Sequence, residues 1–91
     1  MLTHVVLMRL FDAADAPRAQ ELLAGLATEI PQVRSLVNGT DVGHGPHSWH
    51  LALITTHDNA GDLAAYQAHP RHQDVVGWLG PRIAERAIVD F

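Results

Sequence analysis

The sequence contains no cysteine and no lysine. The absence of cysteine excludes disulfide bonds and thiolate chemistry, and it suits a reducing compartment, so we expect a cytoplasmic protein. No apolar run approaches the roughly 20 residues that a helix needs to span a bilayer. The opening stretch MLTHVVLMRLF lacks the layout of a signal peptide and is typical of a strand instead. We therefore expect no membrane partner.

Positive charge is also scarce. The six basic residues are all arginine and are outnumbered by ten acidic ones, which gives a formal net charge of −4. The arginines form no cluster, so the chain lacks the basic surface that nucleic-acid binding requires. No glycine-rich phosphate-binding motif occurs either, and the sequence predicts no nucleotide or other cofactor.

Histidine is what the sequence has in excess, with seven in 91 residues. Histidine titrates near neutral pH and ligates metals, so each position needs an explanation. Three histidines recur at every third residue, namely His44, His47 and His50. This spacing spans a glycine- and proline-rich loop, so it does not place them on one helix face. Tight metal sites use defined scaffolds and usually add a carboxylate or a thiolate. We predict no native metal site, and we expect a surface position for His57, which closes a strand.

The length of the chain indicates a single domain over residues 1–91. Asp58 is the expected N-cap of the helix that follows it. Patterns of apolar, proline and glycine residues predict strands at 3–11, 33–37, 49–57 and 84–91 and helices at 17–30, 59–68 and 70–79. This β-α-β-β-α-α-β order predicts an α+β, ferredoxin-like subunit.

The first expected strand is apolar on both faces. His4, Val6 and Met8 on one face alternate with Val5 and Leu7 on the other. A single layer of helices covers only one face of a sheet, so the other face would expose an apolar patch that is unusual for a monomer. We therefore expect a homodimer.

Three proton-handling rings surround Pro70 in the stretch AYQAHPRHQDVV, namely Tyr66, His69 and His72. Pro70 ends one helix and begins the next. His72 shares a face with the apolar residues of the second helix, so it points inward. The helix N-terminus and burial both favour its neutral form, which accepts a proton. Tyr66 on the first helix can donate a hydrogen bond, and such a pair suits an enolisation or aldol step.

The same rings also have a structural interpretation. Polar side chains at a junction between helices often satisfy the unpaired backbone groups of the helix ends. His69 fits this role better than Tyr66 and His72 do. His4, on an apolar strand face, is compatible with a satisfied core histidine.

Over nearly its whole length the sequence resembles the stress-responsive α/β-barrel domain (Dabb) family. The resemblance rests on the opening His4-Val5-Val6, on EIPQVRSL, LALITT and YQAHPRHQDVV, and on the closing VDF. It implies two ferredoxin-like subunits that form a dimeric α/β barrel. The family includes plant polyketide cyclases, in which the tyrosine and the second histidine of the YQAHPRHQDVV block act as a donor and a base, and this implies catalytic roles for Tyr66 and His72.

A histidine near the start of the first strand lines the pocket of those cyclases, which matches His4. Val6 and Met8 share its strand face, and His69 completes the expected lining. His57 departs from the family pattern, where an aromatic residue is expected. Three functions stay open: a cofactor-independent, cyclase-like enzyme with a pocket for a phenolic or polyketide-like ligand, a non-catalytic stress protein with a structural barrel, and a monooxygenase of the same architecture.

Overall fold

The structure, a computed structural model, describes the whole chain, residues 1–91. Its strands are β1 (Leu2–Leu10), β2 (Ser35–Thr40), β3 (Leu51–His57) and β4 (Ile83–Asp90). Its helices are α1 (Ala16–Ala24), α2 (Leu26–Glu29), α3 (Ala60–Ala68) and α4 (Pro70–Leu79), with short 3-10 turns at Ala13–Asp15 and Gly80–Arg82. This order of elements confirms the predicted ferredoxin-like α+β subunit.

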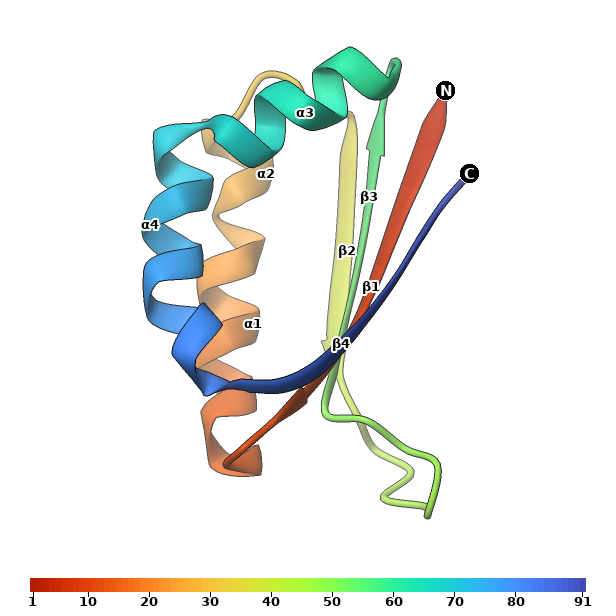
Figure 1. Cartoon of the computed structure of the whole chain (residues 1–91), viewed down its shortest axis with the longest axis vertical. Helices are drawn as coiled ribbons and strands as arrows, with labels where there is room; N and C mark the ends of the chain where they lie inside the picture. The colour runs from red at the N-terminus through yellow and green to blue at the C-terminus, as the bar shows by residue number, and fades with distance from the viewer.

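The four strands form one sheet in the order β2-β3-β1-β4, and every neighbouring pair is antiparallel. The helices form a second layer on one face of this sheet (Figure 1). Helices α1 and α4 run along the strands, whereas α3 lies across their ends and meets α4 at Pro70. Because β1 and β4 are neighbours, residues from the two ends of the chain lie side by side.

Alternation along the strands places one face of the sheet in the core. The buried positions are His4, Val6, Met8 and Leu10 on β1, and Leu51, Leu53, Thr55 and His57 on β3. The set on β1 follows the alternation predicted from the sequence. Leu23, Leu26 and Leu79 from the helices pack against them, and each such leucine contributes roughly 1.5–3 kcal/mol when it is fully buried.

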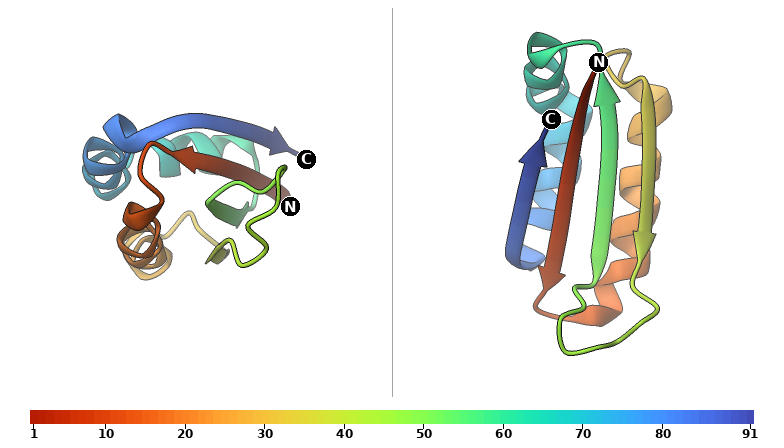
Figure 2. Two further views of the ribbon diagram at one scale, coloured as in Figure 1. Left: turned by 90° about the horizontal axis from the view of Figure 1, so that it is seen from below. Right: turned by 90° about the vertical axis from the view of Figure 1, so that its right-hand side faces the viewer.

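The opposite face of the sheet carries no helix, as Figure 2 shows. The strand register aligns Val37, Ile54, Val5 and Val89 in one apolar row across all four strands. Leu7 lies in the next row, between alanines. Four of these five side chains are exposed, from 39% for Ile54 to 65% for Val37. A continuous apolar patch of this kind is typical of a surface that associates with another protein.

Most predicted boundaries lie within two residues of the observed ones, but two elements differ further. The helix expected at 17–30 is interrupted at Gly25, whose carbonyl accepts a hydrogen bond from the Thr28 hydroxyl at 3.2 Å. Glycine is a poor helix former, which explains why the interruption falls there. The strand expected at 33–37 lies at 35–40 instead, because its last three residues pair with β3 and do not form part of the loop.

The N-cap of α3 is Asn59, and the prediction of Asp58 is wrong. The side-chain oxygen of Asn59 accepts a hydrogen bond from the Asp62 backbone N–H at 2.9 Å. Asp58 instead accepts two hydrogen bonds from Arg34, at 2.8 and 2.6 Å. These bonds lower the pKa of Asp58 below its ordinary value.

His57 is fully buried, so the predicted surface position is also wrong. Its Nδ1 lies 2.7 Å from the Gln32 carbonyl oxygen, and its Nε2 lies 2.8 Å from the Thr55 hydroxyl. A carbonyl only accepts hydrogen bonds, so Nδ1 carries the proton and Nε2 accepts from Thr55. Both ring nitrogens are satisfied, as expected for a buried histidine with a structural role.

Candidate functional site

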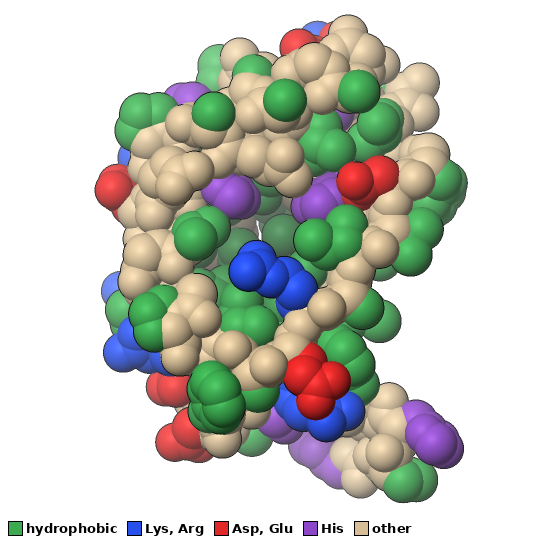
Figure 3. Space-filling view, in the orientation of Figure 1, with side chains coloured by type: hydrophobic (Ala, Val, Ile, Leu, Met, Phe, Trp, Pro, Cys, Tyr) green, Lys and Arg blue, Asp and Glu red, His purple; other side chains and the backbone are tan.

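An open cavity lies between α4 and the strands β1 and β4, close to the junction of α3 and α4. Its volume is about 100 Å³. Figure 3 shows the hollow, with histidine side chains on both sides and a basic side chain across it. Five of the six residues predicted for a site line this cavity: His4, Val6, Met8, Tyr66 and His72.

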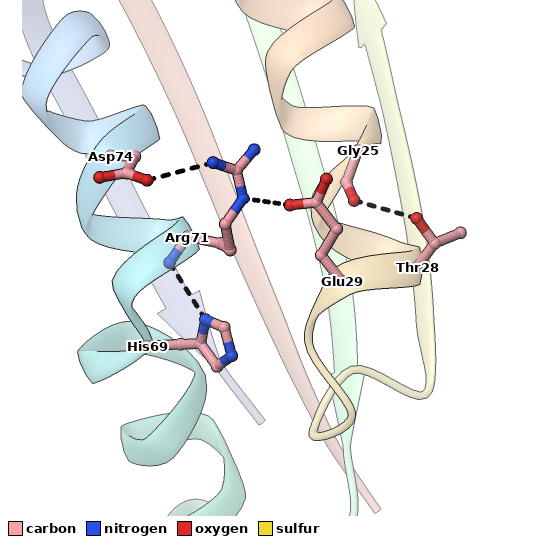
Figure 4. Close-up of polar contacts among 6 residues, drawn as sticks. All are labelled: Gly25, Thr28, Glu29, His69, Arg71 and Asp74. Atoms are coloured by element: carbon pink, nitrogen blue, oxygen red, sulfur yellow. Dashed lines mark hydrogen bonds and ion pairs between the residues drawn. The ribbon is translucent and has the colours of Figure 1, made fainter.

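His69 is the sixth residue, and it does not line the cavity. Its Nδ1 accepts a hydrogen bond from the Arg71 backbone N–H at 3.1 Å and so caps α4 (Figure 4). The Arg71 side chain joins Glu29 of α2 to Asp74 of α4. This part of the YQAHPRHQDVV block therefore starts α4 and ties it to α2. The predicted pocket role of His69 is corrected to a structural one, because its ring is engaged by the helix end.

Tyr66 is fully buried on the inner side of α3. Its ring lies between the rings of His57 and His72, with centroid distances of 5.0 and 4.7 Å. Burial raises the pKa of Tyr66 to about 12, so the hydroxyl keeps its proton at neutral pH. The Tyr66 Oη has no hydrogen-bond partner in the protein. The cavity thus contains a fixed proton donor that lacks an acceptor.

His72 is half-buried in the first turn of α4 and meets the Tyr66 ring edge-on, with an interplanar angle of 64°. Burial is the main cause that lowers the pKa of His72, the nearby His4 lowers it further, and the Gln67 backbone opposes the shift. The neutral ring therefore dominates at neutral pH. Its Nδ1 is buried and also has no partner in the protein. A neutral imidazole held in this way is suited to accept a proton or a hydrogen bond from a bound molecule.

His4 is buried on the inner face of β1, and its Nδ1 contacts the carboxylate of Asp90 on β4. The two residues are paired across the strands. Because the ionised carboxylate only accepts hydrogen bonds, the His4 Nδ1 carries a proton, and in the neutral ring Nε2 is left as an acceptor. The ring lines the cavity, so His4 offers a second, oriented acceptor near His72.

Two residues that shape the site were not predicted, namely Asp90 and Arg86. Both lie on β4, where Asp90 faces His4 and Arg86 faces Met8 across the strand pair. The sequence signal that could have identified them is alternation along the last strand. Arg86, Ile88 and Asp90 are spaced by two and therefore share one strand face. Their partners on β1 depend on the register between the first and last strands, and local sequence does not specify it.

The remaining histidines lie away from the cavity. His44 and His47 are exposed in the loop that follows β2, and His50 accepts a hydrogen bond from the Leu10 backbone N–H at 2.8 Å. No group of three or more His, Cys, Asp or Glu side chains is arranged to hold a metal ion. None of the helices combines the length and the apolar character needed to cross a membrane.

The fold and the cavity define a class of protein, a ferredoxin-like α+β subunit with a small pocket. The chain matches the model of the stress responsive A/B barrel domain family over residues 2–91, and it belongs to that family. A comparison with proteins of curated function finds no significant match.

Solved structures support the same fold. A dimeric protein of unknown function and ferredoxin-like fold from Bacteroides fragilis is 27% identical, with a TM-score of 0.88, over 99% of this chain and 93% of that one. A dimeric ferredoxin-like protein of unknown function from Thermobifida fusca is 26% identical, with a TM-score of 0.87, over 99% and 88%. A hydroxynitrile lyase from Passiflora edulis is 14% identical, with a TM-score of 0.82, over 99% and 90%, and shows the fold alone.

Proposed function

We propose that this protein binds a small phenolic or polyketide-like molecule in the cavity and catalyses proton transfer on it without a cofactor. One observation carries the proposal: Tyr66 Oη and His72 Nδ1 are both buried, both unpaired and on rings in contact. Leaving a buried polar group without a partner costs about 1–3 kcal/mol, so native proteins rarely do it. A bound molecule that accepts a hydrogen bond from the Tyr66 hydroxyl and donates one to His72 Nδ1 removes both costs.

The chemistry follows from the two protonation states. The neutral imidazole of His72 takes a proton from the carbon next to a carbonyl group of the ligand, and the electron pair of the broken C–H bond moves toward the carbonyl oxygen. The phenol of Tyr66 donates a hydrogen bond to that oxygen as negative charge develops on it. The resulting imidazolium then returns the proton to the enolate or to the product alkoxide. His4, fixed by Asp90, provides a second acceptor for a ligand hydroxyl.

We also infer that two copies of the chain form the functional barrel. The apolar row on the open face of the sheet supports this, since nothing else in the chain covers it. The relatives from Bacteroides fragilis and Thermobifida fusca, at 27% and 26% identity, are dimeric. Pairing of two open faces would give each subunit a buried second side of its sheet, which a domain of this size needs for stability.

The binding part of the proposal is tested by a thermal-shift screen with small phenols and polyketide mimics. A ligand at 100 times its dissociation constant adds about 2.7 kcal/mol to the stability of the protein. We expect a shift for the native protein and its loss in His72→Ala. His69→Ala is the matched control, because His69 lies in the same block but caps α4, so this variant is less stable yet keeps the ligand-induced shift.

A structural, non-catalytic role predicts a different result. The native protein then shows no shift with any phenol, or His72→Ala and His69→Ala both lose stability while keeping an equal shift. Either outcome would reject the proposed pocket function.

A further inference from the structure

Arg86 differs from every other arginine of the chain, because no acidic side chain pairs with it. The other five all form ion pairs, in which Arg9 pairs with Glu85, Arg18 with Glu21, Arg34 with Asp58, Arg71 with Glu29, and Arg82 with Asp15. Arg86 is also the only arginine that lines the cavity. An unpaired guanidinium beside a cavity attracts an anionic group of a bound molecule.

The strand register directs Arg86 toward the cavity. Arg86 pairs with Met8 and Ile88 with Val6, and these four residues line the cavity together with His4, whose cross-strand partner is Asp90. Figure 3 shows a basic side chain across the hollow and an acidic side chain beside one of the histidines at its edge.

Strand β4 therefore carries opposite charges at the two ends of this wall, Arg86 in the lining itself and Asp90 behind His4. Asp90 at one end is engaged with His4, and Arg86 at the other end is free. Four residues of extended strand separate them, which is about 13 Å between their Cα atoms. The Tyr66 and His72 rings lie toward the His4 end, since Tyr66 contacts His57 as well as His72, and His57 pairs with Leu2 near the start of β1. An anionic ligand is repelled at the Asp90 end and attracted at the Arg86 end.

We propose that the cavity takes a ligand that bears a carboxylate, and that Arg86 binds this group and orients the ligand so that its reactive part lies against Tyr66 and His72. This inference rests on the proposed function and names the substrate class. The planar guanidinium presents two N–H donors in the geometry of a carboxylate, so the contact fixes orientation as well as position. No ion pair within the subunit has to break for it to form.

The test uses a pair of probes that differ in charge but little in size, 4-hydroxybenzoate and 4-hydroxybenzamide. Their dissociation constants are measured by calorimetric titration with the native protein, Arg86→Gln and Arg18→Gln. We expect the native protein to bind the acid about tenfold more tightly than the amide, as one charge-assisted contact allows. Arg86→Gln should abolish this preference. Arg18→Gln removes the same charge from a helix surface and should keep it.

Added salt provides a second readout. Because Arg86 is exposed to solvent, the acid should bind more weakly as ionic strength rises, whereas the amide should not respond.

The outcomes separate this inference from the proposed function. If the acid and the amide bind the native protein equally, or if Arg86→Gln keeps the preference, Arg86 does not recognise a carboxylate. The pocket function still stands in that case, provided that His72→Ala weakens both probes. If neither probe binds the native protein, the pocket function and this inference are both wrong.

Discussion

At the scale of single residues, the site depends on burial that leaves polar atoms unpaired. Tyr66 and His57 are equally buried, yet both nitrogens of His57 are satisfied and the Tyr66 hydroxyl is not. The contrast distinguishes a histidine that serves the core from a tyrosine whose hydroxyl is free for the ligand of the proposed function. It also gives the two residues opposite responses to mutation.

Tyr66→Phe is therefore expected to leave the protein without ligand as stable as before, or up to about 1 kcal/mol more stable, because it removes an unpaired buried hydroxyl. Urea denaturation at pH 7 measures this change. The same variant should lose the ligand-induced shift. A loss of more than about 1 kcal/mol would show that the hydroxyl has a structural partner.

The pH dependence of stability follows from His72. Burial lowers its pKa in the folded protein below the value of about 6.5 that an unfolded chain shows, so the unfolded chain binds the proton more readily. The contribution of the neutral ring is complete above about pH 6.5 and is lost as the pH falls below it. The unfolding free energy of the native protein should decline more steeply with acidification than that of His72→Gln. Equal slopes of unfolding free energy against pH in the two proteins would contradict the assignment of this pH dependence to His72.

At the scale of elements, the site is assembled where α3, α4, β1 and β4 meet. Pro70 was sufficient to predict the boundary between α3 and α4, and alternation along β1 predicted which of its residues share a face; together they put Tyr66 and His72 at one junction. Those signals are local, since a proline fixes a helix start and strand side chains alternate strictly.

Features that depend on distant partners could not be predicted in this way. His57 is buried by its contacts with Gln32 and Thr55, and Asp90 reaches His4 only through the pairing of the first and last strands. Asp58 and Asn59 are both good capping residues by type. The ion pair of Asp58 with Arg34, which precedes β2 and is distant in sequence, decides between them.

This choice of cap can be tested directly. Asn59→Ala should destabilise the protein by about 0.5–2 kcal/mol, because the first turn of α3 loses its side-chain acceptor. Asp58→Ala removes only an exposed ion pair and should cost less. Urea denaturation of both variants gives the comparison. The reverse order would restore Asp58 as the cap.

At the scale of the whole molecule, one face of the sheet forms the cavity with the helices and the other is free to meet a second copy. Leu7 is at the middle of the open face, on a central strand, and is 43% exposed. A single subunit therefore tolerates a polar residue there, but a face-to-face dimer does not.

If the proposed dimer forms through this face, Leu7→Glu is expected to convert it to a monomer of lower stability, as measured by sedimentation velocity at micromolar concentration. Val42→Glu is the matched control, since Val42 is an exposed valine in the loop after β2 and away from the sheet face, and this variant should stay dimeric. A monomeric native protein, or a dimeric Leu7→Glu variant, would show that the open face is not the interface.

The central claim is that Tyr66 and His72 transfer a proton on a bound ligand, and hydrogen exchange measures this most directly. The methylene hydrogens of 4-hydroxyphenylacetone, which lie next to its carbonyl group, are followed by proton NMR in D₂O at neutral pH. We predict that the native protein accelerates their exchange by about 10²-fold or more over buffer, as a positioned general base does. His72→Ala should abolish the acceleration and Tyr66→Phe should reduce it, whereas His69→Ala should retain it. Exchange no faster than in buffer, or equal acceleration by His72→Ala, would contradict the claim.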